Sequence, residues 1–121
     1  MSRILVTDDN SDYRQSILDI LRLEGYDVFE AADGAEAVDL ARSQSPDLIL
    51  CDVDMPVMDG FAVLAIIKKE FPHIPFLLVT GHDDQESREQ GLQLGADDYL
   101  VKPMKIEILL EKLNAYLTNE D

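Results

Sequence analysis

Residues 4–9 read Ile-Leu-Val-Thr-Asp-Asp, and two later stretches repeat this pattern of a short apolar run that ends on a charged side chain. The second stretch is Leu-Ile-Leu-Cys-Asp at residues 48–52, and the third is Tyr-Leu-Val-Lys at residues 99–102. Short runs that are apolar throughout are typical of strands buried on both faces of a parallel sheet. Ligands collect at the carboxyl ends of such strands. The pattern therefore predicts that three carboxylates and one ammonium meet at one edge of a sheet.

The charges at this edge do not balance. Two carboxylates about 4 Å apart repel by roughly 4 kcal/mol at an effective dielectric of about 20. Lys102 alone cannot offset Asp8, Asp9 and Asp52. A hard divalent cation is the simplest remedy, and Mg²⁺ typically binds one or two carboxylates together with water and a phosphate group. The cluster therefore predicts a Mg²⁺ site that serves phosphoryl chemistry.

Composition limits the classes of protein to consider. The chain has 121 residues, which fits a single domain over residues 1–121. Its net charge of −15 repels nucleic acid and anionic membrane, so we expect no direct nucleic acid binding by this chain and no membrane partner. Cys51, the single cysteine, lies in an apolar run, which indicates an inert buried thiol. Neither a signal-peptide pattern nor a membrane-spanning apolar stretch is found, and we expect a cytoplasmic protein.

Strand-like and helix-like segments alternate five times along the chain. Short apolar runs predict strands over residues 4–7, 27–31, 48–51, 76–80 and 98–101. Helical spacing predicts helices over residues 13–24, 61–71, 84–94 and 106–117, and a weaker one that follows a turn at Asp33-Gly34 and ends at residue 43. This alternation predicts an α/β fold in which a five-stranded parallel sheet carries five helices on both faces.

Apolar spacing also predicts which helix faces are buried. The first helix is expected to bury Tyr13, Ile17, Ile20 and Leu21. The last helix is expected to bury Ile106, Leu109, Leu110, Leu113, Tyr116 and Leu117. The fourth helix differs, because residues 82–91 contain no apolar side chain and Gly91 lowers helix propensity further. This segment is either a merely solvated helix or a loosely held element of the kind that switches.

Several short motifs lie directly before or after the predicted strands, or in the loop that follows the third. They are Asp8-Asp9 after the first strand, Asp52 after the third, Met55-Pro56 and Asp59-Gly60 in the next loop, Thr80 after the fourth strand, Gly95-Ala96-Asp97-Asp98-Tyr99 leading into the fifth, and Lys102-Pro103 after it. Together they resemble the receiver domain of two-component response regulators, the CheY-like superfamily, over the whole chain. The resemblance implies a flavodoxin-like fold with strand order 2-1-3-4-5 and a phosphorylation-dependent switch in a phosphorelay.

The same resemblance implies how the acidic residues act. Asp52 would be the phospho-acceptor, a nucleophile that attacks a phosphohistidine of a histidine kinase or a histidine phosphotransfer protein. Asp9 and Asp52 would bind Mg²⁺ through their side chains, Asp8 through water, and Asp54 through its backbone carbonyl. Such a chain catalyses only its own phosphorylation and slow autodephosphorylation. We therefore expect that it is not an enzyme that turns over a separate substrate.

Roles also follow for three residues at the later strands. Lys102 would pair with Asp52 at rest and with a phosphoryl oxygen afterwards. The hydroxyl of Thr80 would hydrogen-bond another phosphoryl oxygen, and Tyr99 would turn inward once Thr80 moves. The Lys102–Pro103 peptide bond is expected to be cis. The fourth helix, fifth strand and fifth helix would form the surface that meets an unidentified downstream protein and that would also carry a homodimer contact.

Two other functions stay open. The run Asp52-Val53-Asp54 after an apolar strand also resembles the nucleophile motif of haloacid-dehalogenase phosphatases, in which Asp52 would be phosphorylated and Asp54 would be the general acid and base. Its place on the third strand of a short chain disfavours that assignment. A degenerate receiver that serves as a permanent docking module is disfavoured because every site residue is present.

The lifetime of the phosphorylated state depends on the rim of the site. Asp54 follows the acceptor by two residues and His82 follows Thr80 by two, so both could modulate the rate of phosphoryl loss. If the two side chains face each other, Asp54 favours the protonated histidine and the pair hinders the attacking water. The alternative is two solvated loop residues with no contact, since exposed pairs are worth only about 0–1 kcal/mol.

Overall fold

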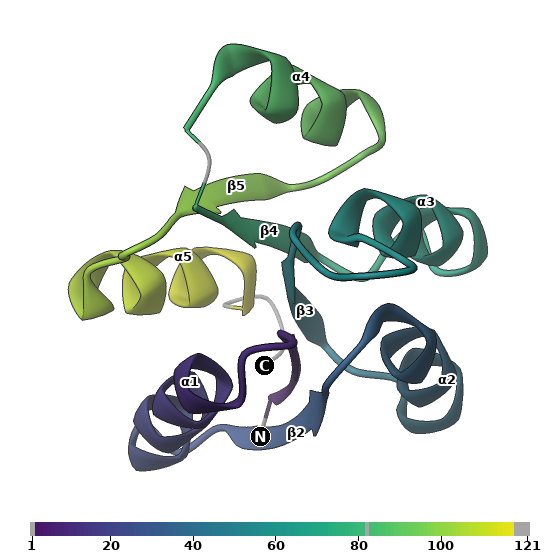
Figure 1. The fold of residues 1–121 in the computed structure, drawn as a ribbon. Helices are drawn as coiled ribbons and strands as arrows, with labels where there is room; N and C mark the ends of the chain where they lie inside the picture. Colours follow the sequence, from purple (N-terminus) through teal and green to yellow (C-terminus); the bar gives the residue numbers. More distant parts are fainter. Residues whose placement is uncertain (1, 82, 118–121) are drawn as a thin grey trace.

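The computed structural model describes residues 2–81 and 83–117. Five parallel strands form one sheet in the order β2-β1-β3-β4-β5 (Figure 1). The elements follow one another as β1 (Arg3–Thr7), α1 (Ser11–Leu23), β2 (Asp27–Ala31), α2 (Gly34–Gln44), β3 (Leu48–Asp52), α3 (Gly60–Glu70), β4 (Phe76–Thr80), α4 (Gln85–Gln93), β5 (Asp98–Val101) and α5 (Ile106–Leu117). The predicted α/β fold and the strand order implied by the resemblance are both confirmed.

Helices cover both faces of the sheet, and each face has its own hydrophobic core. Helices α1 and α5 pack on one face, whereas α2 and α3 pack on the other with α4 beyond them (Figure 1). Every residue of β3 and β4 is buried, as expected for central strands that are covered on both sides. The carboxyl ends of these strands are therefore held between the two hydrophobic cores.

Strand boundaries agree closely with the prediction. Strands β2, β4 and β5 have the predicted bounds, while β1 begins one residue earlier, at Arg3, and β3 ends one residue later, at Asp52. Asp52 is thus the last residue of a buried strand, paired with Val79 of β4, rather than the first residue of a loop. This placement limits the freedom of its backbone.

Acidic and amide side chains set where four helices begin. The residues Asn10, Asp33, Asp59 and Asp84 each accept a hydrogen bond from a backbone N–H in the first turn of α1, α2, α3 and α4. Such caps typically stabilise a helix by about 1 kcal/mol. The prediction of a turn at Asp33-Gly34 was therefore wrong, because Asp33 is the cap and Gly34 is the first residue of α2.

The buried helix faces differ from those that apolar spacing predicted. Helix α1 buries Ile17 and Leu21 as expected, but it also buries Leu18, while Tyr13 and Ile20 are partly exposed. Helix α5 buries Leu109, Leu113 and Leu117. The expectation for Ile106 was wrong, because this residue is 48% exposed in the first turn of α5, which projects beyond the end of the sheet.

Helix α4 packs most closely against the sheet at its glycine. Gly91 is its one buried residue in the part of the chain that the structure describes. A Cβ added there would lie 2.7 Å from Cδ1 of the buried Leu78, so the absent side chain permits the close approach of α4 to β4. Gly91 has a low helix propensity, but its missing side chain allows α4 to pack against β4. No helix in the described ranges is both long and apolar enough to span a membrane.

Candidate functional site

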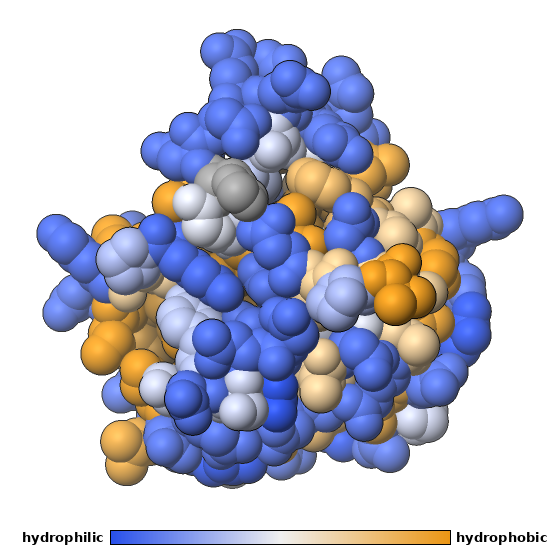
Figure 2. All heavy atoms as spheres, viewed as in Figure 1, coloured by the Kyte–Doolittle hydropathy of each residue, from blue (hydrophilic) through white to orange (hydrophobic). Residues whose placement is uncertain are grey.

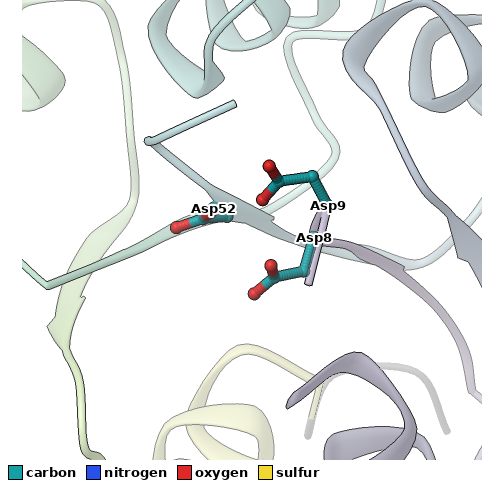
Figure 3. A group of neighbouring side chains, drawn as sticks. All are labelled: Asp8, Asp9 and Asp52. Atoms are coloured by element: carbon teal, nitrogen blue, oxygen red, sulfur yellow. The ribbon is translucent and has the colours of Figure 1, made fainter. Parts of the chain in front are cut away.

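Three carboxylates meet at the carboxyl edge of the sheet, as the sequence predicts. Asp8 and Asp9 directly follow β1, and Asp52 ends β3. One oxygen of each carboxylate lies within 4.8 Å of the others. Figure 3 shows the side chains of Asp8 and Asp9 turned toward the side on which the Asp52 carboxylate lies. Asp8 and Asp52 are buried, whereas Asp9 is exposed and gives the cluster its opening to solvent.

Lys102 enters this cluster from the loop after β5 and pairs with Asp52, as expected, but its shorter contact is with Asp8. Its Nζ donates a hydrogen bond to Oδ2 of Asp8 at 2.9 Å, and it lies 3.4 Å from Oδ1 of Asp52. The ammonium also lies over the ring of Tyr13 in α1, 4.3 Å from the ring centre. The lysine thus bridges two carboxylates and favours Asp8. The Lys102–Pro103 peptide bond is cis, as expected.

Burial decides the acidity of Asp52. Burial, followed by the charge of Asp8, raises the pKa of Asp52 from 3.8 to about 6. Lys102 and a backbone hydrogen bond from Asp54 act in the opposite direction, but they do not outweigh these two causes. Burial lowers the pKa of Lys102, but its hydrogen bond to Asp8 and the charge of Asp52 outweigh burial. The pKa of Lys102 is therefore raised above its usual value, and the lysine stays charged.

The donor set fits a hard divalent cation. Oδ1 of Asp52 is buried and has no hydrogen-bond partner among the described residues. A buried carboxylate oxygen without a hydrogen bond is costly, and the single Lys102 ammonium beside it is shared with Asp8, so a further cation would stabilise this atom. The exposed Asp9 beside it offers a second carboxylate, and oxygen ligands are those that Mg²⁺ and Ca²⁺ prefer. The acidic cluster could therefore hold a metal ion.

A buried arginine fixes the turn that carries Asp8 and Asp9. Nη1 of Arg14 donates to the backbone carbonyl of Asp8 at 2.5 Å, and its Nε donates to Glu30 of β2 at 2.7 Å. The backbone N–H of Asn10 donates to Oδ1 of Asp8 at 2.9 Å. Sequence reasoning missed Arg14. The sequence offers one indication of this role, which is that Arg14 lies next to the apolar face of α1 formed by Ile17 and Leu18.

Thr80 ends β4, accepts a backbone hydrogen bond from the N–H of Lys102 at 2.7 Å, and is fully buried. Its Oγ1 donates to Oδ2 of Asp54 at 3.3 Å, a contact that the sequence did not suggest. Tyr99 is also buried, so its ring already faces the interior in this structure. Burial raises the pKa of Tyr99, while hydrogen bonds with Thr80 and Ser87 oppose that rise.

The position of the remaining predicted site residue is not described. His82 lies outside the described residues, so its pairing with Asp54 stays a prediction. The expected metal ligation by the backbone carbonyl of Asp54 likewise stays a prediction. The structure does bring Asp8, Asp9, Asp52 and Lys102 into one cluster, with Thr80 and Asp54 hydrogen-bonded to each other beside it.

Comparison with known proteins assigns this fold and site to a class. The family model for the response regulator receiver domain matches residues 4–114, and the chain belongs to this family. It is a receiver domain of two-component response regulators, the class that the carboxylate cluster and the sheet order indicate. The comparisons give no support to the haloacid-dehalogenase alternative.

Individual relatives agree with this assignment. The chain is 43% identical over 115 residues to "Response regulator MprA" of Mycolicibacterium vanbaalenii, which covers 95% of this chain and 50% of that protein. It is 40% identical over 115 residues to "Transcriptional regulatory protein PrrA" of Mycobacterium tuberculosis, covering 95% of this chain and 49% of that protein. The chain therefore spans about half the length of the curated relatives it matches.

Solved structures show the same architecture over nearly the whole chain. The chemotaxis protein CheY4 of Vibrio cholerae superposes with a TM-score of 0.92 at 36% identity, covering 97% of this chain and 99% of that chain. A CheY-like receiver domain protein of Methanospirillum hungatei superposes with a TM-score of 0.94 at 34% identity, covering 98% of this chain and 94% of that chain.

Proposed function

We propose that this receiver domain, as a single domain over residues 1–121, is switched by phosphorylation of Asp52. The observation that carries the proposal is the buried Oδ1 of Asp52, which lacks a hydrogen bond among the described residues and lies 3.4 Å from the Lys102 ammonium. An oxygen in this position is suited to act as a nucleophile, because a cation lies beside it and no hydrogen bond from the described residues occupies its lone pairs.

The phosphoryl donor is a phosphohistidine of a histidine kinase or a histidine phosphotransfer protein. An oxygen of Asp52 attacks phosphorus, and the bond between phosphorus and the imidazole nitrogen breaks, so the histidine leaves with its electron pair. Lys102 stands where negative charge gathers on the transferred group, and it offsets that charge. Asp8, Asp9 and Asp52, with the carbonyl of Asp54, would hold Mg²⁺, which supplies further charge neutralisation when it is bound.

Thr80 connects this chemistry to the rest of the molecule. Its hydroxyl now donates to Asp54, so it has to exchange that acceptor for a phosphoryl oxygen after transfer. Tyr99 shares a hydrogen bond with Thr80 and would follow it. Because α4 buries only Gly91 among its described residues, a small shift at this point is able to move it.

The output surface is formed by α4, β5 and α5, and it would contact a downstream protein or a second copy of the chain. Asp54 would set the lifetime of the phosphorylated state, with His82 as a candidate partner. The chain carries out only its own phosphorylation and dephosphorylation. A phosphatase that uses Asp52 and Asp54 would instead turn over a generic phosphate monoester.

Labelling by a small phosphodonor tests this function. The protein is incubated with acetyl phosphate and MgCl₂, and intact-mass spectrometry follows the gain of one phosphoryl group. Asp52→Asn should remain unlabelled and Asp39→Asn, an exposed control in α2, should label like the original protein. Excess EDTA should reduce labelling strongly. Equal uptake by Asp52→Asn, or steady release of phosphate from p-nitrophenyl phosphate, contradicts the proposal.

A further inference from the structure

We propose that Tyr13 is a positioning residue whose ring holds the Lys102 ammonium beside Asp52 while the neighbouring carboxylates change partners. The inference rests on the proposed function of Lys102 and adds a residue that the acidic motif does not contain. Tyr13 lies in the first turn of α1, and Lys102 follows β5, so the contact joins two distant parts of the chain.

The contact has the geometry of a cation–π interaction. Nζ of Lys102 lies 4.3 Å from the centre of the Tyr13 ring, within the distance of about 6 Å at which such contacts attract. The same ammonium donates to Asp8 at 2.9 Å and lies 3.4 Å from Asp52. Among the described residues, these three groups lie around the ammonium, and only the ring is uncharged.

This difference in charge decides which contact persists. Asp8 and Asp52 belong to the cluster that would hold the divalent cation, and phosphorylation further changes the charge at Asp52. Each event weakens or redirects the attraction between a carboxylate and Lys102. An aromatic ring is not a ligand for a hard cation such as Mg²⁺, so its contact with the lysine does not compete with metal binding.

The backbone around Tyr13 is held firmly enough for this role. Its N–H donates to Oδ1 of Asn10 at 3.0 Å, which caps α1. The next residue, Arg14, is anchored to the carbonyl of Asp8 and to Glu30. The ring is thus placed by the same contacts that place the Asp8 carboxylate, and the lysine enters a site that is already arranged.

The ring current of Tyr13 provides a direct test without any phosphoryl group. Protons on Cε of Lys102 should resonate upfield of those of exposed lysines in a protein with ¹³C-labelled lysine, with the signal assigned by Lys102→Arg. The upfield shift should remain in Tyr13→Phe and disappear in Tyr13→Leu. It should also remain when MgCl₂ saturates the protein. Movement of the wild-type signal to the exposed-lysine position on addition of MgCl₂ overturns the proposal.

Kinetics then test whether the contact matters for phosphoryl transfer. With acetyl phosphate and saturating MgCl₂, Tyr13→Leu should take up the phosphoryl group roughly threefold to tenfold more slowly, which is the range expected from one such contact. Tyr13→Phe should react at the original rate. The double variant Tyr13→Leu/Lys102→Ala should be no slower than Lys102→Ala, because the ring acts only through the lysine.

Thermal melts establish whether the Tyr13→Leu variant folds. If it does not fold, Tyr13→Met takes its place, because methionine fills similar space without a ring. Additive effects of the Tyr13 and Lys102 variants, or an unchanged rate in the ringless variant, overturn the positioning role. Labelling of Asp52→Asn would instead contradict the proposed function, and it would leave the ring-current result unaffected.

Discussion

Val57 has a backbone conformation that is unfavourable for its β-branched side chain. Its φ is 70°, in the left-handed region, and its side chain is fully exposed in the loop between β3 and α3. A β-branched residue is a true outlier there, and the conformation costs roughly 1–2 kcal/mol for residues with a Cβ. Figure 2 shows apolar side chains at the surface over the loop between β3 and α3. Val57 is 110% exposed, so burial within the chain does not offset this cost.

Replacing Val57 with asparagine should therefore stabilise the fold by about 1 kcal/mol. Asparagine tolerates the left-handed region because its amide bonds to the local backbone. Urea unfolding measures the change as an increase in the midpoint with an unchanged slope. Val57→Ala keeps a Cβ and serves as the control, which should gain little. Equal midpoints for the asparagine and alanine variants would show that strain at this position is not the cause.

The raised pKa of Asp52 predicts a stability that depends on pH. The folded protein binds this proton up to about pH 6, whereas the ordinary pKa is 3.8. A folded state with the higher pKa gains stability from the protonated group, so this contribution is complete below pH 3.8 and is lost as pH rises through 6. Urea unfolding in EDTA should therefore show Asp52→Asn gaining on the original protein between these two values. A constant difference across this range contradicts the prediction.

Single residues also mark the limit of what the sequence predicts. The carboxylate cluster could be predicted because the carboxyl ends of parallel strands share one edge, which places Asp8 and Asp52 together whatever their rotamers. The shorter contact of Lys102 with Asp8 could not be predicted, since the choice between carboxylates less than 5 Å apart depends on the exact path of the loop after β5. The ring of Tyr13 was predicted to be buried, but apolar spacing carries no information about a cation 89 positions later in the chain.

At the scale of elements, the junction between β3 and α3 depends on a glycine. A Cβ on Gly60 would collide with the backbone carbonyl oxygen of Asp52 and would lie 2.8 Å from Cα of Val53. Both atoms belong to backbone that is fixed by the sheet, so neither is able to move away at low cost. The first turn of α3 is thus packed directly against the residue proposed to be phosphorylated.

Gly60→Ala should lower the free energy of unfolding by about 1–3 kcal/mol, the usual cost of forcing extra atoms into a packed site. It should also slow labelling by acetyl phosphate, because relieving the collision moves the end of β3. Thermal melts and intact-mass spectrometry measure the two effects. Gly81→Ala is the matched control, since a Cβ there meets nothing within 4 Å. A Gly60→Ala protein with original stability would show that the junction adapts.

Element boundaries and helix faces differ in how far the sequence predicts them. Strands β2, β4 and β5 were predicted to the residue because turns and prolines interrupt short apolar runs on both sides. Helix faces were predicted less well, as Leu18 and Ile106 show. Apolar spacing identifies the centre of a face, but the width of that face depends on the neighbouring helix and on how far the sheet extends.

At the scale of the molecule, the order of strands is the feature that spacing alone cannot give. Five alternations of strand and helix predict a parallel sheet with right-handed crossovers, yet several lateral orders satisfy that pattern. The order came from the resemblance to receiver domains, and the structure confirms it with β1 paired to both β2 and β3. This pairing is what brings the ends of β1 and β3 side by side and gathers the acidic cluster.

The net charge of −15 and the acidic cluster together predict that Mg²⁺ stabilises the whole fold. A cation that binds only the folded state adds RT ln(1 + [L]/Kd), which is roughly 1.4 kcal/mol at ten times Kd. For a domain of this size the melting temperature should rise by about 5 °C. Any salt also screens the general repulsion of an acidic surface, so the Mg²⁺ titration has to be compared with NaCl at equal ionic strength.

Two aspartate variants separate site binding from screening. Asp9→Asn should melt higher than the original protein without metal, because one repelling charge has left the cluster, but it should lose most of the specific response to Mg²⁺. Asp39→Asn, which removes an exposed charge of α2, should keep that response in full. Equal rises in MgCl₂ and NaCl, or a full response in Asp9→Asn, would assign the effect to screening. Because melting reports the folded state without any phosphodonor, the result bears on the metal site independently of the phosphorylation chemistry.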